Sequence, residues 1–247
     1  MVLLRADDLG YSKGINYGIA ETVRSGVIKN VGLMPNMTDA EHGVRLVAGA
    51  NICIGQHTNV CVGRPLTSPD KIASLVTESG EFKPSAQYRA AKEDFVVLDE
   101  ALLEIEAQYQ RFLELVGRKP DYFEGHAVAS KTLFLGLEAV AKKHGLKYSP
   151  MPLDDKPVTI GATKVYMTME ALRPEYNPFA SLKHMVADAH PDGCDMMVFH
   201  PGFLDDYILK TSSLTTPRTR EAAMLCDPAT REWLEQNHVV PATYTDL

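Results

Sequence analysis

Short apolar runs alternate with amphipathic stretches along most of this 247-residue chain. Runs at 2–6, 31–34, 52–55 and 196–199 favour buried strands, and shorter candidates lie at 122–123, 147–148, 164–166 and 239–240. Helical spacing occurs at 15–25, 38–50, 98–116, 133–144, 179–189, 219–225 and 228–236. This alternation is typical of parallel strands joined by helices. The predicted fold class is therefore α/β, either a barrel or a doubly wound sheet.

Residues 63–96 depart from this pattern. Glycines and prolines interrupt the segment, its apolar periodicity is weak, and a single short helix is expected near 70–76. Long loops within compact domains are often functional, so we interpret it as an excursion or a lid. No linker, internal repeat or low-complexity segment is visible, which predicts one domain over 1–247.

The bulk composition excludes several function classes. A net charge of -7 and a pI near 5.6, without a cluster of basic residues, argue against a nucleic-acid partner. No signal peptide and no membrane-length apolar run is visible, which predicts a cytoplasmic protein without a membrane partner. The four cysteines form no CxxC pair and are expected to be buried free thiols, which fits a reducing compartment.

Four strand candidates end in polar residues. Asp7 and Asp8 follow the run at 2–6, and His57 follows the run at 52–55. Glu124 and His126 follow the run at 122–123, and His200 follows the run at 196–199. Each alone has an ordinary explanation as a capping, turn or surface residue. Because the C-terminal ends of parallel strands converge on one face, we expect these side chains to meet. The other histidines lack such placement and are expected on the surface: His42, His144, His184, His190 and His238.

The adjacent carboxylates of Asp7 and Asp8 repel each other, and their burial requires a compensating cation or proton. One Asp and two His would form a three-ligand site for a divalent metal. The second carboxylate could then act as a base toward water, and a further His could protonate a leaving group. These groups together describe metal-assisted hydrolysis of an amide or ester. Neighbouring strand residues point to opposite faces, so both carboxylates reach one site only if the strand breaks there, as Leu9-Gly10 allows.

The motifs resemble those of the YdjC/ChbG carbohydrate deacetylase family over nearly the whole chain. The matching segments are Ala6-Asp7-Asp8-Leu9-Gly10 with Gly18-Ile19, Gly55-Gln56-His57, Glu106-Ala107-Gln108, Gly117-Arg118-Lys119-Pro120, Gly125-His126, His200-Pro201-Gly202, and 218–221. The order of the opening Ala-Asp-Asp motif and the late His-Pro-Gly motif is specific, whereas each motif alone is weak.

The resemblance implies a distorted, TIM-like (β/α) barrel with its active site at the C-terminal ends of the strands. It implies an enzyme that removes an acetyl group from an N-acetylated mono- or oligosaccharide, such as an acetylated chitooligosaccharide. It also implies a divalent metal ion, magnesium or zinc, and a homodimer. The implied metal ligands are Asp8, His57 and His126, the implied base is Asp7, the implied acid is His200, and candidate substrate contacts are Arg218, which could hold a carboxylate in place, and Glu124.

One motif departs from the family. The family usually reads Asp-x-His-x-His-x-His, whereas this chain has Glu124, His126, Val128 and Ser130 at the four named positions. The family's substrate preference is therefore not carried over. Two alternatives stay open: a hydrolase or isomerase of another sugar or sugar phosphate, and a sugar- or metal-binding relative without catalysis. The sequence does not define the metal, the sugar, its chain length or the acetyl position.

Overall fold

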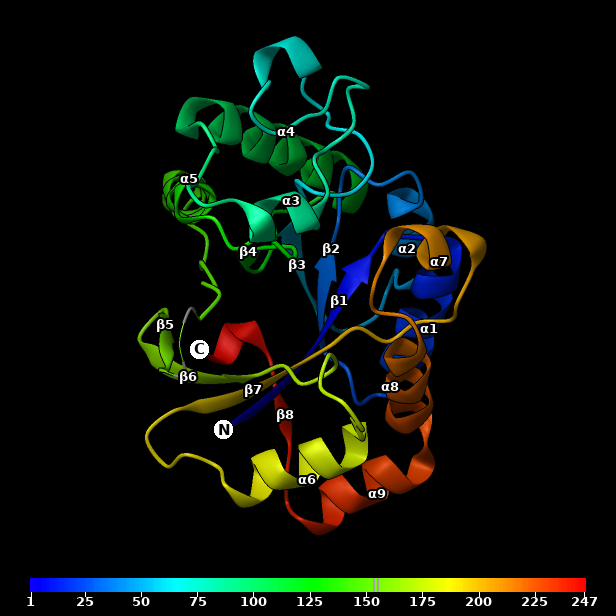
Figure 1. Cartoon of the computed structure of the whole chain (residues 1–247). Coiled ribbons are helices and arrows are strands. Elements are labelled where there is room, and N and C mark those ends of the chain that lie inside the picture. The colour runs from blue at the N-terminus through cyan, green and yellow to red at the C-terminus, as the bar shows by residue number, and fades with distance from the viewer. Residues whose placement is uncertain (153, 155) are drawn as a thin grey trace.

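A curled sheet of mostly parallel strands forms the centre of the molecule (Figure 1). The computed structural model describes residues 1–152, 154 and 156–247, so the predicted domain range is covered except for 153 and 155. The strand order is β4-β3-β2-β1-β7-β6-β5, with β8 paired to the start of β1. The strands are β1 (Val2–Leu9), β2 (Asn30–Leu33), β3 (Cys53–Thr58), β4 (Phe123–Gly125), β5 (Val158–Ile160), β6 (Thr163–Thr168), β7 (Cys194–Phe199) and β8 (Pro241–Ala242). The predicted α/β class is confirmed, in the form of a half-barrel.

All pairs within the sheet are parallel except β5 with β6, which form an antiparallel hairpin. The central strand β1 is buried along its whole length between β2 and β7. Parallel strands covered on both faces are expected to be continuously apolar. The charged residues within β1 are therefore exceptions that need partners.

Helices surround the sheet on its sides and ends. They are α1 (Lys13–Arg24), α2 (Ala40–Leu46), α3 (Ser85–Ala90), α4 (Leu98–Val116), α5 (Lys131–His144), α6 (Pro178–Ala187), α7 (Asp206–Thr211), α8 (Thr216–Cys226) and α9 (Pro228–Gln236). Short 3₁₀ turns occur at Pro69–Lys71 and Tyr244–Asp246. Figure 1 shows α1, α2, α7 and α8 grouped on one side of β1, and α4 with α5 beyond β3 and β4. Helix α4 has the predicted bounds, and it ends at Gly117 in the left-handed conformation that favours glycine.

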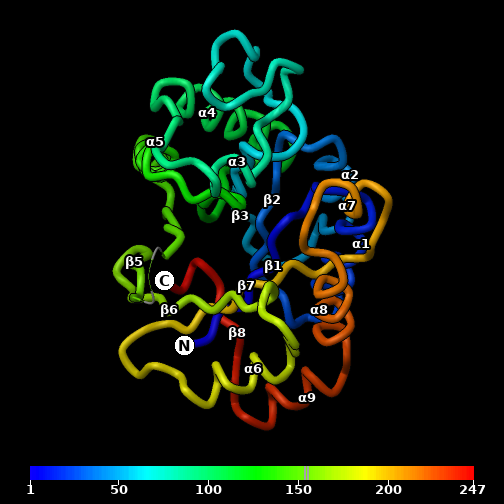
Figure 2. The backbone as a smooth tube through the Cα atoms, viewed as in Figure 1, coloured from blue at the N-terminus to red at the C-terminus, as the bar shows by residue number. Residues whose placement is uncertain are grey.

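The segment 63–96 lies beside α4, at the β3–β4 end of the sheet (Figure 2). The predicted helix at 70–76 is wrong, because only the 3₁₀ turn at Pro69–Lys71 forms there, and α3 was not predicted. The segment is anchored at both ends. Glu104 of α4 accepts hydrogen bonds from the amides of Leu66 and Thr67, and Asp94 accepts one from the Ser130 hydroxyl.

Three smaller expectations have clear outcomes. The predicted strand at 239–240 is wrong, since β8 is Pro241–Ala242. All four cysteines are free, and Cys53, Cys61 and Cys194 are buried. His42 and His144 are half-buried rather than on the surface: His144 contacts the Glu106 carboxylate.

In the described part of the chain, no helix has both the length and the apolarity that crossing a membrane requires.

Candidate active site

The C-terminal end of β1 presents Asp7 and Asp8 together because the strand is irregular at this point. Asp8 has a φ of 79°, in the left-handed region that non-glycine residues rarely adopt. The β1–β2 pairing shifts register between Ala6 and Leu9. A bulge of this kind redirects a side chain and is common near active sites. The expected break in the strand is confirmed, although it falls on Asp8 itself rather than on Leu9-Gly10.

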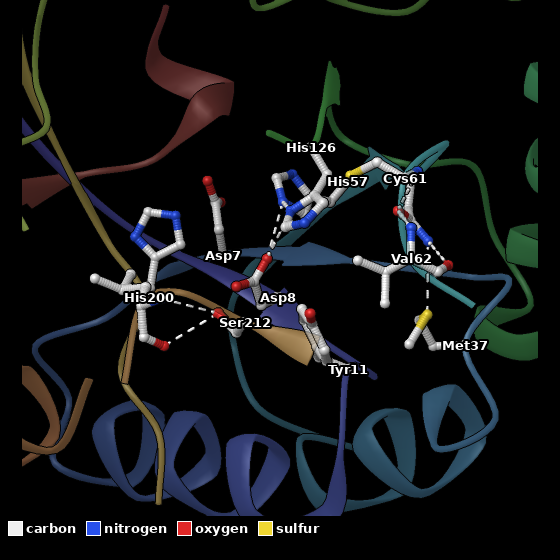
Figure 3. A network of polar contacts seen from close by, with 12 residues as sticks. Asp7, Asp8, Tyr11, Met37, His57, Cys61, Val62, His126, His200 and Ser212 are labelled. Atoms are coloured by element: carbon white, nitrogen blue, oxygen red, sulfur yellow. Dashed lines mark hydrogen bonds and ion pairs between the residues drawn. The ribbon is translucent and has the colours of Figure 1, made fainter. Parts of the chain in front are cut away.

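Asp8, His57 and His126 converge on one point (Figure 3). The Asp8 Oδ1 atom lies 3.1 Å from His57 Nε2 and 3.0 Å from His126 Nδ1, and these two nitrogens are 2.9 Å apart. Strands β1 and β3 and the end of β4 supply the three residues, as the convergence of strand ends predicts. Donor atoms about 3 Å apart match the spacing of neighbouring ligands around one ion with bonds of about 2.0–2.2 Å.

Two of the ligand candidates, His57 and Asp8, each contact a second charged side chain. The Nδ1 atom of His57 contacts the Glu124 carboxylate, which fixes the ring and directs Nε2 toward Asp8. A carboxylate behind a histidine is the usual support for a metal-ligating imidazole. Arg218 Nη2 donates to Asp8 Oδ2 at 2.7 Å and is buried, so its guanidinium is paired with a carboxylate of the protein itself.

The electrostatics of this cluster favour an added positive charge. Burial lowers the pKa of His57, but the nearby carboxylates of Glu124 and Asp7 outweigh it and raise this pKa well above its usual value. For His126, Asp8 likewise outweighs burial and raises the pKa to about 9. Burial alone would raise the pKa of Asp8, but Arg218 and His126 outweigh it and lower this pKa well below its usual range. The histidines thus face a strongly negative potential, which a bound cation would satisfy.

The count of charges supports the same conclusion. The described residues place three buried carboxylates around the two histidines, from Asp7, Asp8 and Glu124, against the two buried guanidinium groups of Arg5 and Arg218. With both histidines neutral, as metal ligation requires, one negative charge remains without a compensating cation, and burial of such a charge is very costly. The donor set therefore fits a divalent metal ion, and the remaining negative charge favours a cation at this point.

Asp7 lies beside this cluster but outside the three-donor group. Its Oδ2 atom accepts a hydrogen bond from Arg5 Nη2 at 2.7 Å, whereas its buried Oδ1 atom has no partner among the described groups. A buried, unpartnered carboxylate oxygen is free to accept a proton or a hydrogen bond from a bound molecule.

His200 follows β7 and lies on the opposite side of Asp7 from the histidine pair in the view of Figure 3. Its backbone amide donates to Glu221 Oε2 at 2.6 Å, while its ring atom Nδ1 is buried without a partner in the described part of the chain. Burial lowers the pKa of His200 to about 4, so the ring is neutral at neutral pH. The backbone of His200 is therefore held in place, and its ring has an atom available for a proton.

These residues line a cavity of about 340 Å³. Asp7, Asp8, His57, His126 and His200 all contribute to its wall, and so do Arg218 and Glu124. Ser85 and Arg89 of α3 also line it, which places part of the 63–96 segment at the cavity. A wider hollow of about 670 Å³ adjoins it, since both are lined by Met151, Met167 and Met169, and contains none of the predicted site residues.

Sequence reasoning missed three residues of this site. Arg5 interrupts the apolar run of β1 two positions before Asp7, and this spacing on a strand was the available signal. Glu221 was noted only as part of a motif, yet it holds the His200 backbone. The Tyr11 ring packs edge-on against His126, with centroids 6.0 Å apart, and its sequence context gave no signal.

Comparison with known proteins places the chain in a family. The family model for YdjC-like protein matches residues 1–236. Carbohydrate deacetylase 2 of Listeria innocua is 31% identical over 100% of this chain and 98% of its own length. Chitooligosaccharide deacetylase of Citrobacter koseri is 28% identical over 91% of this chain and 90% of its own.

A solved structure has the same fold. The putative cellobiose-phosphate cleavage protein of Enterococcus faecalis superposes with a TM-score of 0.84, at 21% identity, over 99% of this chain and 97% of that one. At this identity the likeness concerns the fold alone. The family model and the full-length relatives carry the assignment that the resemblance predicted: the chain belongs to the YdjC-like protein family.

Proposed function

We propose that this chain is a divalent-metal-dependent hydrolase that removes an acetyl group from an N-acetylated mono- or oligosaccharide. One observation carries the proposal: a three-donor group of Asp8, His57 and His126 shares a cavity with an unpartnered carboxylate oxygen on Asp7 and an unpartnered ring nitrogen on His200. Relatives named carbohydrate deacetylase and chitooligosaccharide deacetylase, aligned over almost the whole chain, support the reaction class.

In this proposal Asp8, His57 and His126 hold the metal. A divalent ion at this position supplies Lewis acidity toward an acetyl carbonyl. The two imidazole donors favour an ion of the zinc type over magnesium, which prefers oxygen ligands. Arg218 and Glu124 keep Asp8 and His57 in the orientation that the ion requires.

Asp7 and His200 divide the proton transfers. Asp7 Oδ1 accepts a proton from the attacking water, since this atom is buried and has no other partner. His200 Nδ1 donates a proton to the leaving amine. Because burial keeps the pKa of His200 near 4, its ring is neutral before turnover, so the proton that it passes to the amine is the one that Asp7 has taken from water.

The experiment is acetate release from N-acetylglucosamine oligomers, with and without added divalent metal. We expect release with metal and its loss with EDTA. The Asp7→Asn variant is expected to retain metal and lose turnover, because it keeps the shape of Asp7 but not the base. Asp99→Asn, an exposed carboxylate in the first turn of α4, is the matched control.

Two results would contradict the proposal. The first is no acetate release across a broad panel of acetylated sugars, which would favour a binding protein or another sugar reaction. The second is loss of metal in Asp7→Asn, which would exchange the roles assigned to Asp7 and Asp8. The homodimer and the cytoplasmic location stay predictions.

A further inference from the structure

Arg5 is a charged residue inside a strand that is otherwise suited to a buried sheet. It is only 5% exposed, and its guanidinium lies between two carboxylates of the site. Nη2 donates to Asp7 Oδ2 at 2.7 Å and lies 3.7 Å from Glu124 Oε2. One guanidinium therefore spans the proposed base and the carboxylate that orients His57.

The guanidinium is itself held by hydroxyl groups. Nη1 donates to the Tyr244 hydroxyl at 2.8 Å, and the Ser149 hydroxyl lies 3.0 Å from the same phenol oxygen. The Tyr244 ring stacks on Tyr122, with centroids 3.7 Å apart and planes at 11°. Tyr244 is fully buried in the 3₁₀ turn at Tyr244–Asp246, so Arg5 has little freedom to move.

The space around Asp7 and Glu124 is shaped for this arrangement. Gly32 in β2 leaves room for both carboxylates, since a Cβ there would lie 2.8 Å from Asp7 Oδ1 and 3.2 Å from Glu124 Oε1. With Oδ2 bound to Arg5, Oδ1 is the oxygen of Asp7 that has no partner among the described groups. Arg5 thus determines which oxygen of Asp7 is available.

We propose that Arg5 is a positioning residue for the deacetylation. By contacting both Asp7 and Glu124, Arg5 fixes the position of the base relative to the metal-ligating His57. The proposal rests on the proposed function. It differs from a plain structural ion pair because its loss should change turnover and metal affinity together. The planar guanidinium places Nη2 at both carboxylates while Nη1 binds the Tyr244 hydroxyl, and the single ammonium group of a lysine cannot reach both sides at once.

The test uses the full-length, metal-loaded protein with Arg5→Met, Arg5→Lys and Tyr244→Phe. We expect kcat of Arg5→Met to fall about 10–100-fold with KM within about twofold, and zinc affinity, measured by chelator competition, to fall about 10-fold. Added guanidinium chloride at low millimolar concentration should restore part of kcat. Arg5→Lys should regain only part of the loss.

Tyr244→Phe removes one support of Arg5 without touching the cavity, so we expect a loss of kcat of several-fold. The controls are Arg111→Met, which breaks an exposed ion pair on α4, and Tyr166→Phe, which removes an exposed hydrogen bond to Asp192. Both should retain the kcat and the zinc affinity of the unmodified protein.

Three results would overturn the proposal: a folded Arg5→Met with unchanged kcat and zinc affinity, a rise in KM alone, or no effect of Tyr244→Phe on either quantity. The Tyr244→Phe variant keeps the proposal testable if Arg5→Met does not fold. If the unmodified protein releases no acetate, the proposed function fails. Zinc affinity still tests Arg5 in that case, and unchanged affinity in both variants would overturn its role.

Discussion

Gly32 in β2 offers a way to displace Asp7 without changing its chemistry. A Cβ at this position would lie 2.8 Å from Asp7 Oδ1, whereas ordinary contacts of a Cβ begin at 3.4 Å. The Gly32→Ala substitution therefore requires a shift of about 0.6 Å, the difference between these two distances. Glu124 Oε1 and His57 Cβ, each at 3.2 Å, limit the directions in which the strand could relax.

The size of the effect follows from this shift. A misplacement of about 1 Å can cost about 100-fold in rate, so a shift of this size predicts a fall in kcat of about 10-fold. Overpacking of a close-packed interior costs about 1–3 kcal/mol, so the variant should fold but melt at a lower temperature. KM should change little, because Gly32 itself does not line the cavity.

The assay compares kcat, KM and thermal melting of Gly32→Ala with those of Gly136→Ala. A Cβ at Gly136 in α5 would lie 2.9 Å from Ile105 Cδ1, the end of a flexible side chain away from the site. That control should retain the kcat of the unmodified protein. A folded Gly32→Ala protein with an unchanged kcat would refute the argument that the position of Asp7 limits the reaction.

Three further predictions concern groups around the cavity. Glu124→Gln should weaken zinc binding about 10–100-fold in a competition titration, since His57 loses its carboxylate partner; unchanged affinity would contradict this role. Arg218→Met should lower the free energy of unfolding of the metal-free protein by about 3–5 kcal/mol, because it removes the partner of the buried Asp8 Oδ2 atom. Denaturant titrations should show a smaller loss with zinc bound, and equal losses would argue against a cation beside Asp8. Burial raises the pKa of Glu221 from 4.5 to about 7, so its contribution to stability is complete below pH 4.5 and is lost as pH rises to about 7. Relative to Glu221→Gln, the unmodified protein in EDTA should therefore lose up to about 3 kcal/mol between pH 5 and 8, and parallel pH profiles would count against it.

Local patterns were sufficient to predict most elements of the fold. The apolar runs of β1, β2, β3 and β7 and the amphipathic period of α4 each carry their own signal. The segment 63–96 gave no such signal, because its structure depends on distant anchors such as Ser130 and Glu104. The three-residue β5 and the two-residue β8 are too short for a periodic pattern to identify them.

The candidate site was predictable where parallel strands carry polar residues to one edge. This reasoning brought together Asp8, His57 and His126 from positions far apart in sequence. It did not provide the left-handed backbone of Asp8 or the bridging of Asp7 and Glu124 by Arg5, since both depend on packing between neighbouring strands. The replacements in the third motif also gained a structural meaning: Val128 is buried in the core and Ser130 caps α5.

The central claim is that Asp8, His57 and His126 bind one catalytic divalent ion. The most direct measurement is elemental analysis of the purified protein, followed by anomalous scattering from its crystals at the absorption edge of the metal found. We expect one ion per chain, in contact with Asp8 Oδ1, His57 Nε2 and His126 Nδ1. An ion located elsewhere, or metal-free crystals grown with zinc in which these three side chains lie apart, would contradict it.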